Sequence, residues 1–265
     1  MGAESKSEKK LVPGTQTLSR GLALLELVGE GLSDVRGIAE RLDIPRSTAA
    51  RMLSNLVAEG YLHHIPYRGY TLGPKLILLG QRATEQRPLV SIAHPFLEAL
   101  AQETRDTVHF GVLDRGEVLY LEKLSGTRGL EMRSRVGSRM PVASTGLGKS
   151  MMMARPKREW QAFYQDAWTF AATQPDRPPL CSFDALCADL TEAAARGWTY
   201  DLEENEWGIR CIGAPVRDAS GQAIAAVSVA SAITFMPEDR MERLGPTVAR
   251  IAREISESLG WRADQ

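Results

Sequence analysis

The stretch PRSTAARMLSNLVAEG, residues 45–60, decides the fold of the first part of the chain. Its pattern predicts a helix that begins at Pro45, because proline suits the first position of a helix, and that ends at Gly60. One face is apolar and predicts packing on neighbouring helices through Ala49, Met52, Leu53, Leu56 and Val57. The opposite face is small and polar, with Ser47, Ala50, Arg51 and Ser54, and with Arg46 beside it.

Helical patterns also precede this stretch, and a hairpin pattern follows it. A first helix is predicted by apolar residues that repeat every three or four positions: Leu18, Leu22, Leu25 and Val28. Ser33 or Asp34 can cap a second helix. Residues 61–73, YLHHIPYRGYTLG, predict two short strands around a turn. We therefore expect a winged helix-turn-helix over 15–73, after a flexible polar tail over 1–14.

The third helix has the side chains that a DNA-reading helix needs. Small and hydrogen-bonding groups on its exposed face allow it to enter the major groove. Residues 45–75 carry four Lys or Arg and one acid, whereas residues 15–44 carry three basic and five acidic residues. The residues expected to contact DNA are Arg46, Ser47, Thr48, Ala50, Arg51 and Ser54 in the helix, and Arg68 at the hairpin tip. The alternative is a three-helix module with a solvated polar face.

Composition places the chain among globular proteins and excludes several classes. It has 265 residues, 43% hydrophobic and 25% charged, with a formal net charge of −1. No apolar run approaches the roughly eighteen residues that span a bilayer, so no membrane partner is expected. The polar N-terminus lacks the apolar core of a signal peptide. Three cysteines without a CxxC pair fit a reducing compartment, and we expect a cytoplasmic protein.

The second part of the chain mixes helices with strands. Residues 74–88 predict a linker helix that Pro88 closes. From 89 to 263, alternating apolar segments such as 108–114 and 117–124 are typical of strands. The residues from 209 to 231 predict a hairpin turning at Ala219, Ser220 and Gly221. A final helix is expected from Pro237. This mixture predicts an α+β domain that senses a ligand or catalyses a reaction.

The stretch PVASTGLGKSMMM, residues 141–153, has the appearance of a phosphate-binding loop. Gly148, Lys149 and Ser150 fit that pattern, but Ala143 stands where it needs a glycine. Gly146 and Gly148 would allow a ligand to approach the backbone, and the start of the following helix favours an anion. The four histidines have no metal-ligand spacing, so neither a metal nor a cofactor is expected.

Two blocks of sequence resemble the IclR family of bacterial transcriptional regulators. The first runs through QTLSRGLALLELV, GIAERLDIPRSTAARMLSNLVAEGYL and YTLGPKLILLG, and the second through SRMPVASTGLGKSMM and DLEENEWGIRCIGAPVRD. The resemblance extends from about residue 15 to 260. Within the family, RSRVGSRMP and EENEWGIRC are most similar to the ketodeoxygluconate-repressor branch. The resemblance implies a GAF-like C-terminal domain that holds a small organic acid, with TGLGK in its pocket.

The resemblance also implies which residues form this pocket. Backbone donors map to Gly146 and Leu147, polar side chains to Asp201, Cys211 and Ser228, and walls to Met132, Met140 and Ile209. Many relatives have a serine where this chain has Ala230. Arg133 and Arg135 lie two apart on a segment expected to be extended, so they should share a face and could bind a sugar acid.

Together these patterns predict a DNA-binding transcriptional regulator, with repression as the first expectation. Its effector would be a small organic acid such as a sugar acid or a keto acid. A recognition helix reads only a few base pairs, so a homodimer or tetramer on a palindromic double-stranded operator is expected. Two alternatives stay open: an enzyme that uses Cys211 and Asp201, and a module that binds other proteins.

Overall fold

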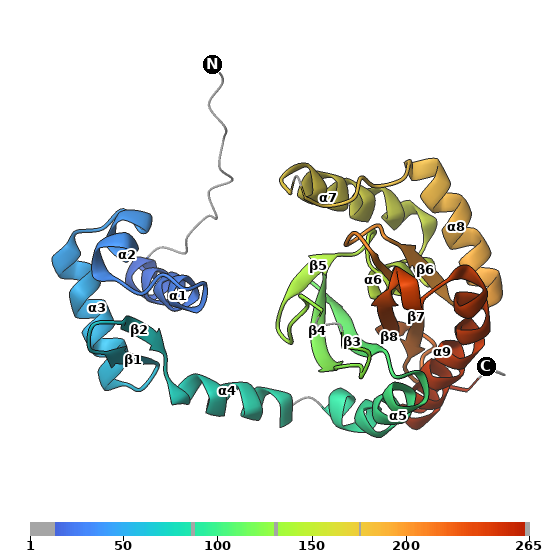
Figure 1. Cartoon of the computed structure of the whole chain (residues 1–265), viewed down its shortest axis with the longest axis horizontal. Helices are drawn as coiled ribbons and strands as arrows, with labels where there is room; N and C mark the ends of the chain where they lie inside the picture. The colour runs from blue at the N-terminus through green and yellow to red at the C-terminus, as the bar shows by residue number, and fades with distance from the viewer. Residues whose placement is uncertain (1–13, 86–87, 130–131, 175, 263–265) are drawn as a thin grey trace, which may run out of the picture. The chain divides into compact units, whose positions relative to one another are not determined.

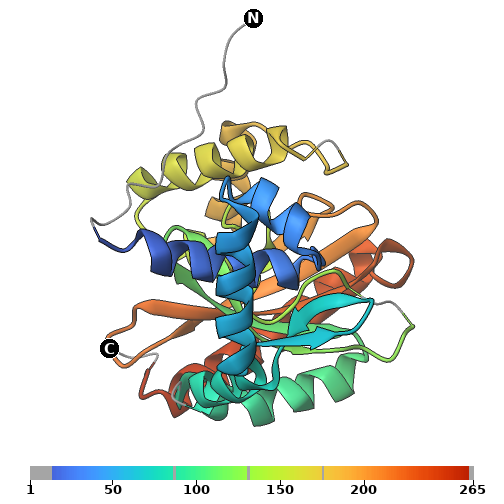
Figure 2. The same ribbon diagram turned by 90° about the vertical axis from the view of Figure 1, so that its left-hand side faces the viewer.

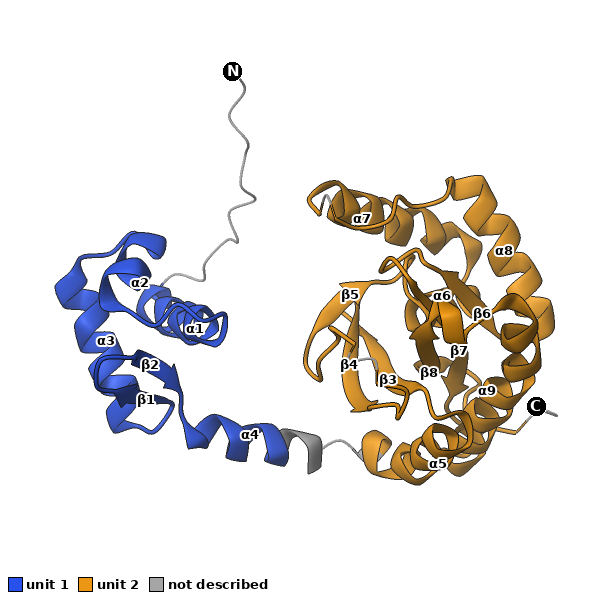
Figure 3. Cartoon of the chain, viewed as in Figure 1, with its two compact units in different colours: residues 1–86 blue, residues 87–265 orange. Residues whose placement is uncertain are grey.

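The computed structural model describes residues 14–85, 88–129, 132–174 and 176–262. The chain divides into two compact units, residues 1–86 and 87–265 (Figure 3). Among the described residues, none of the helices has the length and apolar character needed to cross a membrane.

The first unit consists of three helices, a hairpin and a fourth helix. In chain order these are α1 (Gln16–Gly29), α2 (Val35–Arg41), α3 (Arg46–Ala58), β1 (Leu62–Ile65), β2 (Gly69–Leu72) and α4 (Pro74–Glu85). The two strands pair in antiparallel fashion, with Leu62 opposite Leu72. The predicted winged helix-turn-helix is therefore confirmed (Figure 1).

Local signals in the sequence set the geometry of this unit. Asp34 caps α2 by accepting a 2.9 Å hydrogen bond from the Gly37 amide. A hydrogen bond connects the hairpin to the start of α2: the Tyr70 amide donates to the Ser33 carbonyl over 2.9 Å. Gly69 is required there, since a Cβ would lie 2.2 Å from that same carbonyl oxygen. Fully buried Leu24, Ile38 and Leu53 form the core with Leu62 and Val28.

The apolar pattern of α1 corresponds only in part to this core. Val28 is buried, but Leu18 and Leu22 are 64% and 53% exposed. Ile77, on α4, is also exposed, at 75%. The periodicity predicted the helix correctly, but it does not distinguish a face that packs inside the unit from one left open.

The second unit is a six-stranded antiparallel sheet with helices on both faces. Its strands are β3 (Thr107–Asp114), β4 (Glu117–Leu124), β5 (Arg139–Pro141), β6 (Thr199–Leu202), β7 (Ile209–Arg217) and β8 (Ala223–Ala232). Its helices are α5 (Pro88–Thr104), α6 (Gly146–Met153), α7 (Trp160–Ala172), α8 (Phe183–Arg196) and α9 (Glu238–Ser258), with 3-10 turns η1 (Lys157–Glu159) and η2 (Ile233–Phe235). The strand order is β5-β4-β3-β8-β7-β6, and each neighbouring pair is antiparallel.

Each face of this sheet has its own hydrophobic core. Val108 and Phe110 pack with α5 and α9, whereas Val118 and Tyr120 pack with α6, α7 and α8. Figure 2, seen at right angles to Figure 1, shows α5 and α9 at one level of this unit and α7 at the other. The alternation along a strand therefore sends His109 toward the α6 side, because its neighbours Val108 and Phe110 face the other way. The predicted α+β class is confirmed.

Candidate functional site

The exposed face of α3 is the first candidate site. Arg46, Ser47, Arg51 and Ser54 are exposed, and Thr48 and Ala50 are half-buried. Fully buried Ala49 and Leu53 hold the opposite face against the core of the unit. A guanidinium nitrogen of Arg46 lies 3.9 Å from Glu40, which also pairs with Arg36 over 2.8 Å. Arg51 makes no ion pair with any described residue, so its charge remains available to a partner.

The hairpin adds a second exposed cation to this unit. Arg68 is exposed at the hairpin tip, where its amide closes the turn by donating to the Ile65 carbonyl over 3.0 Å. Tyr67 beside it has a φ of +64° and a fully exposed ring. Both side chains therefore project away from the unit, as a wing that touches DNA requires.

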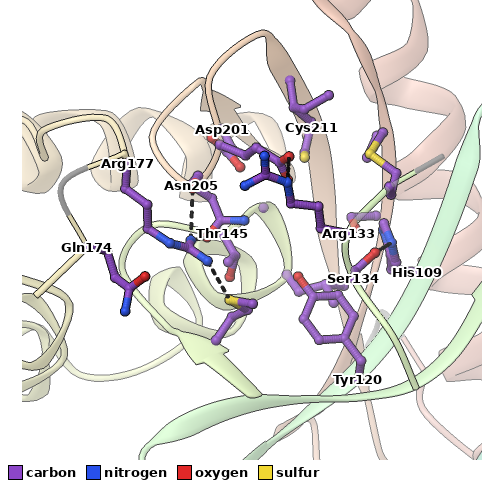
Figure 4. Close-up of a pocket in the computed structure, with 18 of the residues that line it drawn as sticks. His109, Tyr120, Arg133, Ser134, Thr145, Gln174, Arg177, Asp201, Asn205 and Cys211 are labelled. Atoms are coloured by element: carbon purple, nitrogen blue, oxygen red, sulfur yellow. Dashed lines mark hydrogen bonds and ion pairs between the residues drawn. The ribbon is translucent and has the colours of Figure 1, made fainter. Parts of the chain in front are cut away.

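The second candidate site is a cavity of about 150 Å³ on the α6 side of the sheet (Figure 4). Every pocket residue expected from the sequence lines it except Arg135. Those residues are Met132, Arg133, Met140, Gly146, Leu147, Asp201, Ile209, Cys211 and Ser228. Sequence reasoning missed a further set, namely His109, Tyr120, Ser134, Thr145, Gln174, Asp176, Arg177, Asn205 and Glu206.

Strand register brings the polar groups of the cavity floor together. Asp201 lies opposite Cys211, which in turn lies opposite Ala230. Two residues along β8, Ser228 lies opposite His109. Because residues two apart on a strand share a face, these two rows form one continuous patch. Ala230 therefore places a methyl group beside Cys211 in this floor.

The start of α6 forms one wall of the cavity and offers hydrogen-bond donors. Thr145 caps the helix, and its hydroxyl oxygen accepts from the Gly148 amide over 3.0 Å. The Gly146 and Leu147 amides have no hydrogen-bond partner among the described residues, although both residues line the cavity. Free amides at a helix start attract anions, because the helix dipole adds a partial positive charge.

The two glycines at this helix start serve packing inside the protein. A Cβ on Gly146 would lie 3.1 Å from the Cβ of Cys211, and a Cβ on Gly148 would lie 2.1 Å from the Val142 carbonyl oxygen. Gly148 does not line the cavity, so the expectation that it makes room for a ligand is wrong, whereas Gly146 does line the cavity. Both glycines also allow α6 to lie directly on β7 and on the preceding loop.

Lys149 explains why the GLGKS stretch is no phosphate loop. Its side chain is 3% exposed, and its ammonium nitrogen lies 2.7 Å from both Asp189 and Glu204. Burial by itself would lower the pKa of Lys149, but the two carboxylates outweigh burial and raise it. Lys149 does not line the cavity. The lysine that a phosphate would need is therefore committed to an internal ion pair.

Burial controls the charge of the cavity floor. It raises the pKa of Asp201 to about 7, and the nearby Glu204 adds to this effect. It also raises the pKa of the Cys211 thiol well above its usual value, as does the Asp201 carboxylate. Cys211 is therefore a protonated thiol and not an activated nucleophile. Burial lowers the pKa of His109 to about 3, so its neutral ring shares a 2.7 Å hydrogen bond with Ser134.

Arginines at the rim add positive charge. Arg177, which follows α7, donates to the carbonyl and side-chain oxygens of Asn205 over 2.9 and 2.7 Å (Figure 4). Arg133 also lines the cavity, with its Nε 3.4 Å from Glu206. Arg135 lies outside, where its guanidinium donates to the Met132 and Ser134 carbonyls. The expectation that Arg133 and Arg135 share a face is wrong, because their segment is irregular and not a strand.

Comparison with known proteins gives the family of the chain. A model of the IclR helix-turn-helix domain matches residues 17–66, and a model of the bacterial transcriptional regulator IclR C-terminal domain matches residues 81–257. The chain belongs to the IclR family. It is therefore a DNA-binding transcriptional regulator, and the enzyme alternative is set aside because its relatives are regulators.

Several relatives span nearly the whole chain. Transcriptional repressor IclR of Escherichia coli K12 is 28% identical over 250 residues, which cover 92% of this chain and 90% of that protein. The HTH-type transcriptional repressor AllR of the same strain is 28% identical over 265 residues, covering 99% and 97%. The crystal structure of the Thermotoga maritima IclR matches with a TM-score of 0.78 and 28% identity, covering 93% of this chain and all of that one.

Proposed function

We propose that this regulator is a repressor whose affinity for its operator is controlled by a small organic acid bound in the cavity of the second unit. The observation that carries the proposal is the pair of unpartnered amides of Gly146 and Leu147 at the start of α6. Arg177, which makes no ion pair with any described residue, adds positive charge to the same cavity. A carboxylate matches this arrangement, because one charge can be met by two or three donors.

The rest of the cavity favours an acid that also carries hydroxyl or keto groups. Asp201, Tyr120 and Ser228 present hydrogen-bonding atoms away from the helix start. With a pKa near 7, Asp201 can donate a hydrogen bond when protonated or accept one when ionised. Sugar acids and keto acids fit this polarity, as the similarity to the ketodeoxygluconate-repressor branch suggests. An IclR homolog from Microbacterium hydrocarbonoxydans, 25% identical with a TM-score of 0.76, was solved in complex with 4-hydroxybenzoate, a hydroxylated organic acid.

For the first unit, we propose that α3 reads the major groove and that Arg68 contacts the backbone or the minor groove. A two-fold operator needs two copies of this unit. The exposed apolar side chains on α1 and α4 support a homodimer or tetramer, since Leu18, Leu22 and Ile77 are each more than half exposed. An acid that shifts the geometry of such a dimer would change its fit to two half-sites. Such a regulator works in the cytoplasm, where the DNA is.

Calorimetry on the full chain with a panel of sugar acids and keto acids tests the effector proposal. We expect one class to bind, and Arg177→Ala to weaken its binding about tenfold. Arg158→Ala is the matched control, because it removes the same charge from an exposed position outside the cavity. Equal losses in the two variants, or no binding by any acid, would contradict the assignment.

A further inference from the structure

A second cleft in the C-terminal unit, separate from the effector cavity, has the chemistry of an anion site. Its volume is about 460 Å³, and it lies between the end of α8, the end of β7 and helix α9 (Figure 1). It shares no lining residue with the effector cavity. Four arginines line it, together with two tryptophans: Arg196, Arg217, Arg250, Arg253, Trp198 and Trp261. No lining residue is acidic.

Two of the four arginines are already neutralised by carboxylates outside the cleft. Arg196 pairs with Asp189 over 3.2 Å, and Arg250 pairs with Glu254 over 2.8 Å and with Glu103 over 3.3 Å. These arginines have structural roles at the ends of α8 and along α9, so they do not by themselves call for a ligand.

The other two arginines make no ion pair with any described residue. Arg217 is half-buried on β7, and its guanidinium donates only to the Gly221 carbonyl, over 2.8 Å. Arg253 is exposed on α9. The Gly221 carbonyl satisfies one donor of Arg217 but does not neutralise its charge, so an anion at this point would be stabilised.

The tryptophans give the cleft a planar apolar wall. The indole of Trp198 lies so close to α9 that a Cβ on Gly245 would come within 2.3 Å of it. The indole nitrogen of Trp198 is buried without an acceptor among the described residues. Trp261 is half-buried and also lines the cleft. Indole rings stack on planar groups, and guanidinium groups bind phosphate or carboxylate oxygens in pairs.

We propose that this cleft binds a small organic anion that joins a phosphate or carboxylate to a planar ring, with Arg217 and Arg253 holding the charge and the indoles holding the ring. The cleft and the effector cavity lie at opposite ends of the same elements. On α6, Gly146 lines the cavity and Met153 the cleft, and on β7 Cys211 lines the cavity and Arg217 the cleft. A ligand in the cleft would therefore act on the elements that form the effector cavity.

Calorimetry on the full chain with AMP, adenosine and inorganic phosphate tests this site. AMP supplies both the ring and the charge, so we expect it to bind about tenfold or more tightly than either of the other two. Arg253→Gln should weaken AMP binding about tenfold. This variant should fold, because Arg253 is exposed and has no ion pair to lose. Arg217→Gln should have a similar effect.

Two controls make the result specific. Arg243→Gln removes the same charge from an exposed position on α9 outside the cleft, and should leave AMP binding unchanged. Arg177→Ala, in the effector cavity, should also leave it unchanged. No AMP binding, or equal losses with Arg243→Gln or Arg177→Ala, would overturn the proposal. A third result would also overturn it: the wild type does not bind AMP, and Arg253→Gln alters the sedimentation coefficient. The cleft would then be a contact between subunits.

Discussion

The cations of the two units are placed in contrasting ways. Arg51 and Arg68 are exposed on α3 and on the hairpin, whereas Lys149 is 3% exposed and lies between Asp189 and Glu204. An exposed cation without an internal partner is available to DNA, while a buried cation held by two carboxylates is not available to a ligand. The lysine of GLGKS, the stretch that most resembles a phosphate-binding loop, therefore forms an internal ion pair and does not bind a ligand.

The largest effect that tests this contrast comes from Lys149→Met. It leaves Glu204 without a cation and Asp189 with Arg196 alone, so we expect the free energy of unfolding of the C-terminal unit to fall by about 3–5 kcal/mol. Denaturant titration measures this loss. Arg158→Met, at an exposed position, should change stability by less than about 0.5 kcal/mol. A stable Lys149→Met protein that had lost affinity for ATP would instead restore the phosphate-loop hypothesis.

Asp201→Asn should show a pH-dependent effect on stability. The folded protein raises the pKa of Asp201 from 3.8 to about 7, so it favours the protonated form. The resulting stabilisation is complete below the unfolded pKa and is lost as the pH rises through about 7. Asparagine cannot ionise. The unfolding free energy of the variant minus that of the wild type should therefore increase by about 2–3 kcal/mol between about pH 5 and pH 8.

Exposed Asp166 provides the control for this measurement. Asp166→Asn removes a carboxylate from an exposed position and gives the reference with which the Asp201→Asn result is compared. A difference from the wild type that stays constant over the same pH range for Asp201→Asn would show that Asp201 ionises normally in the folded protein.

Arg51→Ala should weaken binding to the specific operator by about 1–3 kcal/mol if its guanidinium reads a base edge. The affinity for non-specific DNA should fall by less, because there the variant loses only the attraction between its charge and the phosphates. Arg41→Ala, at an exposed position on α2, is the matched control, and it should lower the affinities for operator and scrambled DNA equally. Gel-shift titrations with operator and scrambled DNA measure both affinities. If Arg51→Ala lowers them equally, Arg51 does not recognise a base.

The smallest effect is expected for Arg68→Ala. A wing arginine that contacts a phosphate contributes to affinity without contributing to sequence preference. We expect the slope of log K against log salt to decrease by about one unit, with the order of preferred sequences unchanged. An unaltered slope would leave the wing without a role in DNA binding. A slope near zero for the wild type would favour the protein-interaction alternative.

The DNA-binding unit could be predicted from its sequence because its signals are local. The cap at Asp34, the proline before α3 and the turn before Gly69 act within a few residues of where they stand. The pattern of α1 did not predict that Leu18 and Leu22 are exposed. Periodicity shows that a face is apolar, but it does not show whether that face is buried.

The pocket was predictable only in part, because it is assembled from distant segments. The GLGK stretch and the β7 residues could be placed through the family resemblance. The strands β5 and β6, of three and four residues, are too short to give a pattern. Arg177 could not be found, since it lies in a loop after α7 and only the tertiary fold brings it to Asn205. Arg135 was placed wrongly because spacing on a strand says nothing about an irregular segment.

Footprinting of the DNA that flanks the protein's own gene, with and without the acid found by calorimetry, tests the central claim most directly. We expect a protected site with two-fold symmetry. The acid should release the wild type from this site at a concentration about tenfold lower than it needs for Arg177→Ala. Protection that no cavity-binding acid changes would contradict the claim that this cavity controls DNA binding.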